Sequence, residues 1–290
     1  MSATRFACRL KVGGTVLHAE ASRPEWIALS PRFDTFLVRR GADIAVKIED
    51  RPGPPPGVLR FESGGVWRAY DQADGSLLLT FKTGRRIYKS ALLNRSITEG
   101  AIFFPQIRSK PPLRISALDF PLDEMLFQHR WSRDGLVEVH SCGIRDRGGV
   151  LLFAGHSGAG KSTTARLWTR LEPESLVLSD DRVVLDPRGR DTVRAFGTPW
   201  HGMGRFGSPA HAPLKALFFL EQARHSEAVR VHPAEAAARL FSGTFPPIWD
   251  RQATERVMAA CADIAERIPA FRLRFRRDHT AIAAARRAAA

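Results

Sequence analysis

The sequence has few cysteines, and none of them stands in a metal-binding or redox spacing. Cys8, Cys142 and Cys261 are the only three, they lie far apart, and no two form a C-x-x-C pair. This spacing argues against both a zinc site and a disulfide framework. We therefore expect each cysteine to behave as a small buried apolar residue.

Long apolar runs are also lacking. No segment approaches the run of about 20 apolar residues that spans a membrane. Arg5 and Arg9 lie near the N-terminus without a sustained apolar stretch after them, which does not fit a secretory signal. The expected location is the cytoplasm, with no membrane partner.

The chain has no long basic block beside stacking aromatic residues, although it carries a net charge of +14. Arginines are spread along the sequence in ones and twos, as in Arg39-Arg40 and Arg286-Arg287. A positive surface can attract nucleic acid, an acidic partner or nucleotide phosphates. Because the charge is dispersed, a nucleic-acid enzyme is the least favoured of these hypotheses.

The length of 290 residues, 44% of them hydrophobic, indicates two globular domains. We predict a β-rich N-terminal domain over residues 1–115, serving substrate recognition or positioning, and a second domain over 116–290. The runs Val66–Tyr70 and Leu77–Phe81 flank a turn-rich segment and predict a hairpin. Further strands of the first domain are predicted at Phe6–Leu10, Thr35–Val38 and Ile44–Ile48.

The second domain alternates predicted strands and helices, which is the pattern of an α/β fold. A helix is expected to begin near Pro121. The other predicted helices are Thr163–Leu171, Ala234–Phe241, Thr254–Arg267 and Thr280–Ala290. The predicted strands are Leu136–His140, Val150–Ala154, Leu176–Ser179, Val183–Leu185, Leu214–Leu220 and Phe271–Phe275.

One glycine-rich loop carries the strongest functional signal. It fits the pattern G-x-x-x-x-G-K-[ST] and lies between a predicted buried strand and a predicted helix, the context that the motif requires. Backbone N–H groups of such a loop, together with the positive end of the helix, favour bound phosphate. The residues expected to bind nucleotide are Gly155, His156, Ser157, Gly158, Ala159, Gly160, Lys161, Ser162 and Thr163.

Two carboxylates follow the next predicted strand. Asp180 and Asp181 come directly after Leu176–Ser179, and open α/β sheets bind ligands at the carboxyl ends of their strands. A carboxylate there, with the Ser162 hydroxyl, is expected to ligate Mg²⁺. The pair allows a second role, in which one aspartate faces a substrate hydroxyl.

A second glycine-rich loop runs from Phe196 to Arg205 and combines an aromatic residue, a histidine and an arginine. That content is typical of a loop that faces a ligand. His201 could act as an acid, a base or a phosphate donor, and Arg205 as a phosphate clamp. We consider both as candidate substrate-binding residues.

These features together resemble a known family. His140, the loop Gly155–Ser162 and the pair Asp180-Asp181 resemble the catalytic domain of HPr kinase/phosphorylase and its PEP-carboxykinase-like relatives. Four segments are similar to HPr-kinase-related proteins of peptide-modification clusters, including lasso-peptide kinases: Pro121–Leu126, Gly197–Gly202, Pro213–Lys215 and Pro269–Leu273. The resemblance spans about residues 115–278.

The resemblance implies an ATP- and Mg²⁺-dependent kinase acting on a hydroxyl, such as a serine of a peptide or protein, or on a small molecule. It implies that Lys161 stabilises the transferring phosphoryl group, that Ser162 and one aspartate hold Mg²⁺, and that the other aspartate is the base. His140 is implied to lie near the phosphates. The chain lacks a counterpart of the E-R-R-G-L-G signature segment, which leaves regulation by HPr and the reverse phosphorylase activity open.

An alternative is a nucleotide-binding regulatory or scaffold protein with weak or no kinase activity. The motifs above predict nucleotide binding for both. The acceptor, a phosphate donor other than ATP, the roles of the two aspartates and the formation of a homo-oligomer stay open at this point.

Overall fold

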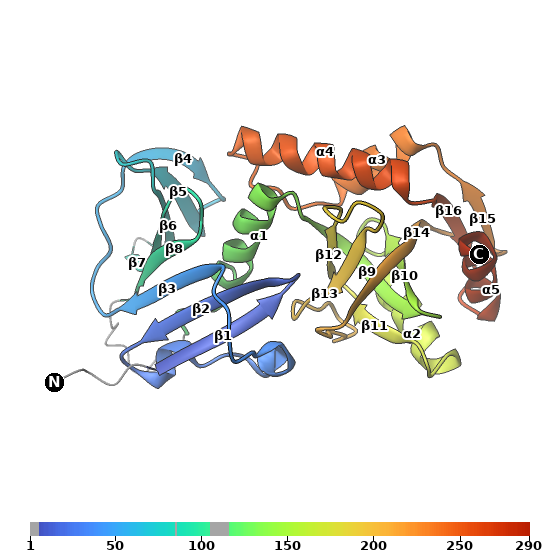
Figure 1. Ribbon diagram of the computed structural model, residues 1–290, viewed down its shortest axis with the longest axis horizontal. Coiled ribbons are helices and arrows are strands. Elements are labelled where there is room, and N and C mark those ends of the chain that lie inside the picture. Colours follow the sequence, from blue (N-terminus) through green and yellow to red (C-terminus); the bar gives the residue numbers. More distant parts are fainter. Residues whose placement is uncertain (1–5, 85, 105–115) are drawn as a thin grey trace. The chain divides into compact units, whose positions relative to one another are not determined.

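The computed structural model describes residues 6–84, 86–104 and 116–290. By compactness the chain divides into one unit that contains residues up to Lys11 and Thr15–Arg130, and a second that contains Val12–Gly14 and Trp131–Ala290. The predicted domain boundary at 115/116 lies at the edge of a segment outside the described residues. The chain is mixed α/β with two sheets, and its first unit is rich in β-structure (Figure 1).

The first unit contains an eight-stranded sheet in the order β1-β2-β3-β8-β7-β6-β5-β4. The predicted hairpin is confirmed, since Trp67 pairs with Phe81 across antiparallel β5 and β6. Strands β2 and β3 run parallel, as do β3 and β8. The strands are β1 (Phe6–Val12), β2 (Thr15–Ala21), β3 (Ile44–Glu49), β4 (Val58–Glu62), β5 (Trp67–Asp71), β6 (Leu77–Thr83), β7 (Arg86–Leu93) and β8 (Glu99–Phe103).

The strand predicted at Thr35–Val38 is wrong. Residues Pro31–Phe36 form a 3₁₀ helix, and a second one spans Pro24–Ile27. Pro31 presets the backbone angle of the first helical position. Phe33 and Phe36 are both buried, because residues three apart lie on the same side of a 3₁₀ helix.

Most helices and strands of the second unit were expected from its sequence, but the short strands β13 and β15 were not. Its helices are α1 (Leu122–Asp134), which begins in the first unit, α2 (Lys161–Leu171), α3 (Pro233–Ser242), α4 (Arg251–Arg267) and α5 (His279–Ala289). Its strands are β9 (Val137–Asp146), β10 (Gly149–Ala154), β11 (Leu176–Ser179), β12 (Arg182–Asp186), β13 (Arg194–Gly197), β14 (His211–Gln222), β15 (Glu227–Arg230) and β16 (Ala270–Phe275). Among the described residues, no helix is long and apolar enough to cross a membrane.

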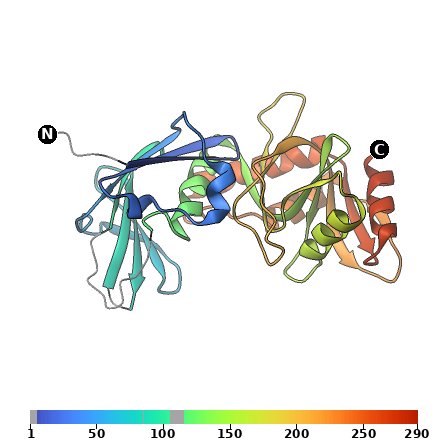
Figure 2. The same ribbon diagram turned by 90° about the horizontal axis from the view of Figure 1, so that it is seen from below.

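Strand β10 is buried on both faces and separates two cores. Val150, Leu152 and Ala154 pack in a core that includes residues of α3 and α4. Leu151 and Phe153 point the other way, into a core that includes residues of α2 and α5. Figure 1 shows these helices around the strands, and Figure 2 gives the view from below. A continuous apolar run is what a strand covered on both faces requires.

The two longest strands of this unit change partners along their length. β9 pairs with β12 up to His140 and with β10 from Ser141 onward. β14 pairs with β13 at its start and then runs parallel to both β10 and β16. As a result the carboxyl ends of β10, β14 and β16 lie at one edge of the sheet, where the glycine-rich loop begins.

Candidate active site

The loop Gly155–Ser162 leaves the carboxyl end of β10 and enters α2, as the motif requires. Gly158 and Gly160 have φ angles of +82° and +118°, a region that glycine adopts without strain. A Cβ atom on Gly160 would also lie 2.6 Å from Cζ of Phe275. Gly160 is therefore needed both for its backbone conformation and for close packing on β16.

Lys161 folds back over the loop. Its Nζ donates hydrogen bonds to the carbonyl oxygens of Gly155, at 2.8 Å, and His156, at 3.1 Å. Burial lowers the pKa of Lys161, an effect that the nearby Asp181 carboxylate partly offsets. The ammonium group thus lies at the beginning of the loop, where it could contact the terminal phosphates of a nucleotide.

Asp180 is buried against the start of α2. The Ser162 hydroxyl donates to its Oδ2 at 2.8 Å, and the backbone N–H groups of Gly202 and Gly204 donate to its two oxygens at 2.9 and 2.8 Å. Only 1% of Asp180 is exposed, so these donors compensate for its desolvation. The adjacent oxygens of Ser162 and Asp180 could hold a magnesium ion together with phosphate oxygens. Among the described residues, no group of three or more His, Cys, Asp or Glu side chains forms a metal site of its own.

Asp181 contacts different partners. Its Oδ1 lies 3.0 Å from Nε2 of His140, and its Oδ2 lies 2.6 Å from a guanidinium nitrogen of Arg182. Burial raises the pKa of Asp181, but the hydrogen bond from His140 and the charge of Arg182 outweigh it, so the net pKa is lowered. The guanidinium of Arg182 also stacks on the Phe245 ring at 4.0 Å. The site therefore holds an ionised, oriented carboxylate.

A tight turn sends the two aspartates to separate places. β11 ends at Ser179, and the Ser179 hydroxyl accepts hydrogen bonds from the backbone N–H groups of Asp181 and Arg182. On the far side of the turn, Arg182 pairs with His140 in the register between β12 and β9. This pairing brings His140 beside Asp181, while Asp180 remains beside Ser162.

The second glycine-rich loop contacts Asp180 through its backbone. Nδ1 of His201 lies 3.2 Å from the carbonyl oxygen of Gly202. Arg205 is exposed, has a φ angle of +57°, and donates its backbone N–H to the same carbonyl at 3.1 Å. Their candidate roles in substrate binding stay predictions, whereas the glycines of this loop have a clear structural role.

Gly204→Ala tests that role. A Cβ atom at this position would lie 2.5 Å from Oδ2 of Asp180, so alanine has to displace the carboxylate and break its hydrogen bond. We expect a loss of about 1–3 kcal/mol in the free energy of unfolding, measured by urea denaturation. Met203→Ala is the control, because Met203 is 87% exposed. Equal midpoints for the two variants would contradict the role of the glycine.

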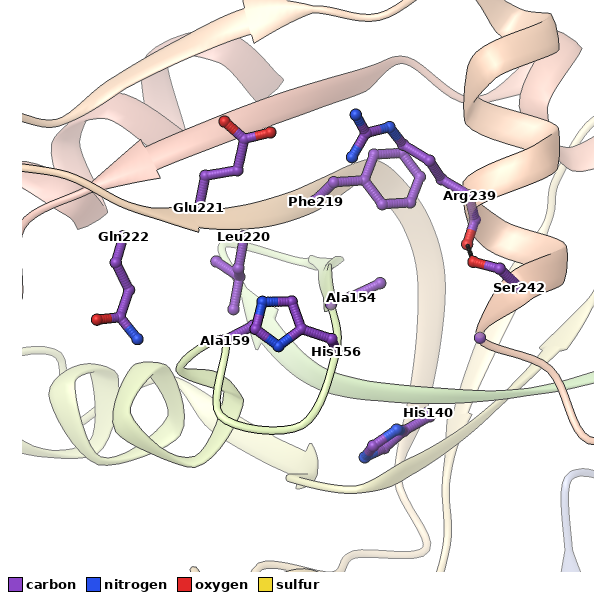
Figure 3. A pocket seen from close by; sticks show the side chains of 12 residues that line it. His140, Ala154, His156, Ala159, Phe219, Leu220, Glu221, Gln222, Arg239 and Ser242 are labelled. Atoms are coloured by element: carbon purple, nitrogen blue, oxygen red, sulfur yellow. Dashed lines mark hydrogen bonds between the residues drawn. The ribbon is translucent and has the colours of Figure 1, made fainter.

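A cavity of about 620 Å³ adjoins the beginning of the loop. It is bordered by His140, Gly155 and His156, by the apolar side chains of Phe219 and Leu220, and by Glu221, Arg239 and Ser242. Figure 3 shows Phe219 and Glu221 on the strand, and Arg239 on α3, across the cavity from His140. A cavity of this size accommodates a small molecule or a few residues of a peptide.

Two site residues were not found from the sequence. The first is Arg182, which follows the aspartate pair and orients Asp181. The second is Gln222, whose side chain donates to the carbonyl oxygen of Gly158 at 3.0 Å. Gln222 has no local signature, because it reaches Gly158 only through the pairing of β14 with β10.

The second unit is thus a mixed α/β domain in which a glycine-rich loop, two aspartates and a histidine surround one site. The chain belongs to the family described as SynChlorMet cassette protein ScmC, whose sequence model matches residues 121–278. That segment contains the loop Gly155–Ser162, both aspartates, His140 and the loop that supports Asp180. No curated protein matches the chain.

Proposed function

We propose that this protein is an ATP- and Mg²⁺-dependent kinase that transfers the γ-phosphoryl group to a hydroxyl, and that its second unit has an HPr-kinase-like P-loop fold. The acceptor is a serine or similar residue of a peptide or protein. The observation that carries the proposal is the separation of the two aspartates, with Asp180 beside Ser162 and Asp181 beside His140.

The first pair, Asp180 and Ser162, suits the binding of nucleotide and metal. The loop N–H groups would hold the phosphates, Lys161 would neutralise the outer ones, and Ser162 and Asp180 would hold Mg²⁺. When bound, the ion neutralises charge on the phosphates. Asp180 is kept in place by Gly202 and Gly204.

The second pair, Asp181 and His140, suits the binding of the acceptor. Lys161 lies against Gly155 and His156, so the terminal phosphate is expected at this end of the loop. His140 lies at the same end and borders the cavity. Asp181 would orient the acceptor hydroxyl and accept its proton, while His140 and Arg182 hold the carboxylate. Because phosphoryl transfer depends on positioning more than on a strong base, a carboxylate with a lowered pKa suits this role.

The test is mass spectrometry of candidate peptides, including those encoded beside the gene, after incubation with ATP and Mg²⁺. A kinase adds one phosphate to a hydroxyl and releases ADP in equal amount. The scaffold alternative predicts nucleotide binding with no phosphorylated product for any acceptor. That result, obtained with peptides that bind the protein, would reject the proposal.

A further inference from the structure

A second cavity, of about 540 Å³, is lined mainly by basic side chains. It lies between the β14–β15 loop, the segment after β16 and helix α5. Its basic residues are Arg224, His225, Arg276, His279 and Arg287, and its one acid is Asp278. No step of the proposed transfer uses any of them.

The basic cavity lies at the sheet edge that carries the glycine-rich loop. Its segments follow the carboxyl ends of β14 and β16, which run parallel to each other, and β14 also runs parallel to β10. Two side-chain hydrogen bonds connect the segment after β16 to the glycine-rich loop. Arg277 donates to Gln222 at 3.2 Å, and Gln222 donates to the carbonyl oxygen of Gly158 at 3.0 Å. A ligand in the basic cavity would therefore be close to bound nucleotide.

The cavity has more positive charge than its own acids neutralise. Asp278 forms an ion pair with Arg276 at 3.0 Å and caps α5 through Thr280, and His225 lies 3.3 Å from Glu227. Within residues 6–84, 86–104 and 116–290, neither Arg224 nor Arg287 has an ion-pair partner. Both are exposed. Two guanidinium groups are thus free to bind an anion from solution.

The spacing of the basic side chains favours an extended ligand. His279 and Arg287 are eight positions apart on α5, which corresponds to about 12 Å along the helix axis. A single phosphate group is too small to reach both ends of such a row. An extended peptide covers the distance with about four residues, since each advances the chain by roughly 3.3 Å.

We propose that the basic cavity is a docking site for an acidic segment of the peptide or protein that carries the acceptor hydroxyl. Glutamate or aspartate side chains of this segment pair with Arg224 and Arg287. Docking keeps the acceptor near the nucleotide while a separate part of the same chain enters the cavity beside His140. The identity of the occupant as the acceptor rests on the proposed function, whereas the binding of an acidic peptide does not.

The experiment measures fluorescence anisotropy of a labelled octaglutamate peptide with the full-length protein, without nucleotide. We expect saturable binding that weakens as salt is raised, because exposed charges are screened. The double variant Arg224→Gln/Arg287→Gln is expected to bind about tenfold more weakly, from two lost ion pairs. Circular dichroism melting verifies that each variant is folded.

The matched control is Arg190→Gln/Arg256→Gln, which removes the same charge from exposed residues outside the cavity. The control should bind like the wild type. An equal loss in both double variants would show attraction to net charge only and would overturn the proposal. Binding of tripolyphosphate but not of octaglutamate would overturn it in favour of a phosphate site. Since no nucleotide is present, these outcomes are independent of whether the protein is a kinase.

Discussion

Replacing Asp181 by asparagine is expected to slow phosphoryl transfer by about 10²–10⁴-fold, the usual contribution of a positioned acid–base group. Asparagine retains the shape and a contact with Arg182 but cannot accept a proton. Nucleotide affinity should change little, because the residues assigned to the phosphates are elsewhere in the site. Single-turnover transfer and nucleotide titration, performed on the same preparation, measure the two effects separately.

Asp180→Asn is the informative comparison. The substitution weakens Mg²⁺ binding at the side chain assigned to the ion. The activity of Asp180→Asn should therefore recover partly at high Mg²⁺, whereas that of Asp181→Asn should not. If Asp180→Asn showed the Mg²⁺-independent defect and Asp181→Asn the Mg²⁺-dependent one, the two assignments would have to be exchanged. Full activity of Asp181→Asn would show that Asp181 is not the base.

The pH dependence follows from the contacts of Asp181. Burial raises the pKa of Asp181, but the lowering by His140 and Arg182 is larger, so the folded-state pKa lies below the unfolded value. The stability that these contacts contribute is present above the unfolded pKa and is lost as the pH falls through the folded one. We therefore expect this carboxylate to stay ionised between about pH 8 and pH 5, so that its own titration does not change the transfer rate in that range.

Lys161→Met is expected to lower the rate of transfer by about 10²–10³-fold, the usual loss when one charge-stabilising group is removed. Methionine has a similar length and suits a side chain that is only 6% exposed. It cannot neutralise developing charge or donate to the carbonyls of Gly155 and His156. Transfer rates and nucleotide affinity, measured together, show whether the lysine acts mainly on bound phosphate or on the transition state.

Lys215→Met serves as the control for that variant, because Lys215 is an exposed lysine on β14. It should have wild-type rates. If Lys161→Met transferred phosphate as fast as the control, the catalytic role assigned to Lys161 would be wrong.

Local patterns in the sequence were sufficient for most elements of the second unit. The buried run Val150–Ala154 predicts β10 because consecutive apolar residues need cover on both faces. The helices and strands expected after it are present within a few residues. The first unit was predicted less completely, and β2, β4, β7 and β8 were missed. Several of these strands pair with a neighbour in sequence, as β4 does with β5 and β7 with β6, whereas the pairing of β3 with β8 joins segments that are distant in sequence.

By itself, the sequence determined that a glycine-rich loop joins a strand to a helix and that two aspartates follow the next strand. It could not separate Asp180 from Asp181, because adjacent residues of the same type have the same local signature. The tertiary structure decided this through contacts that no local pattern contains. Ser162, Gly202 and Gly204 surround one carboxylate, and His140 and Arg182 the other. The physical reason is that hydrogen-bond donors from separate strands and loops meet only when the sheet has formed.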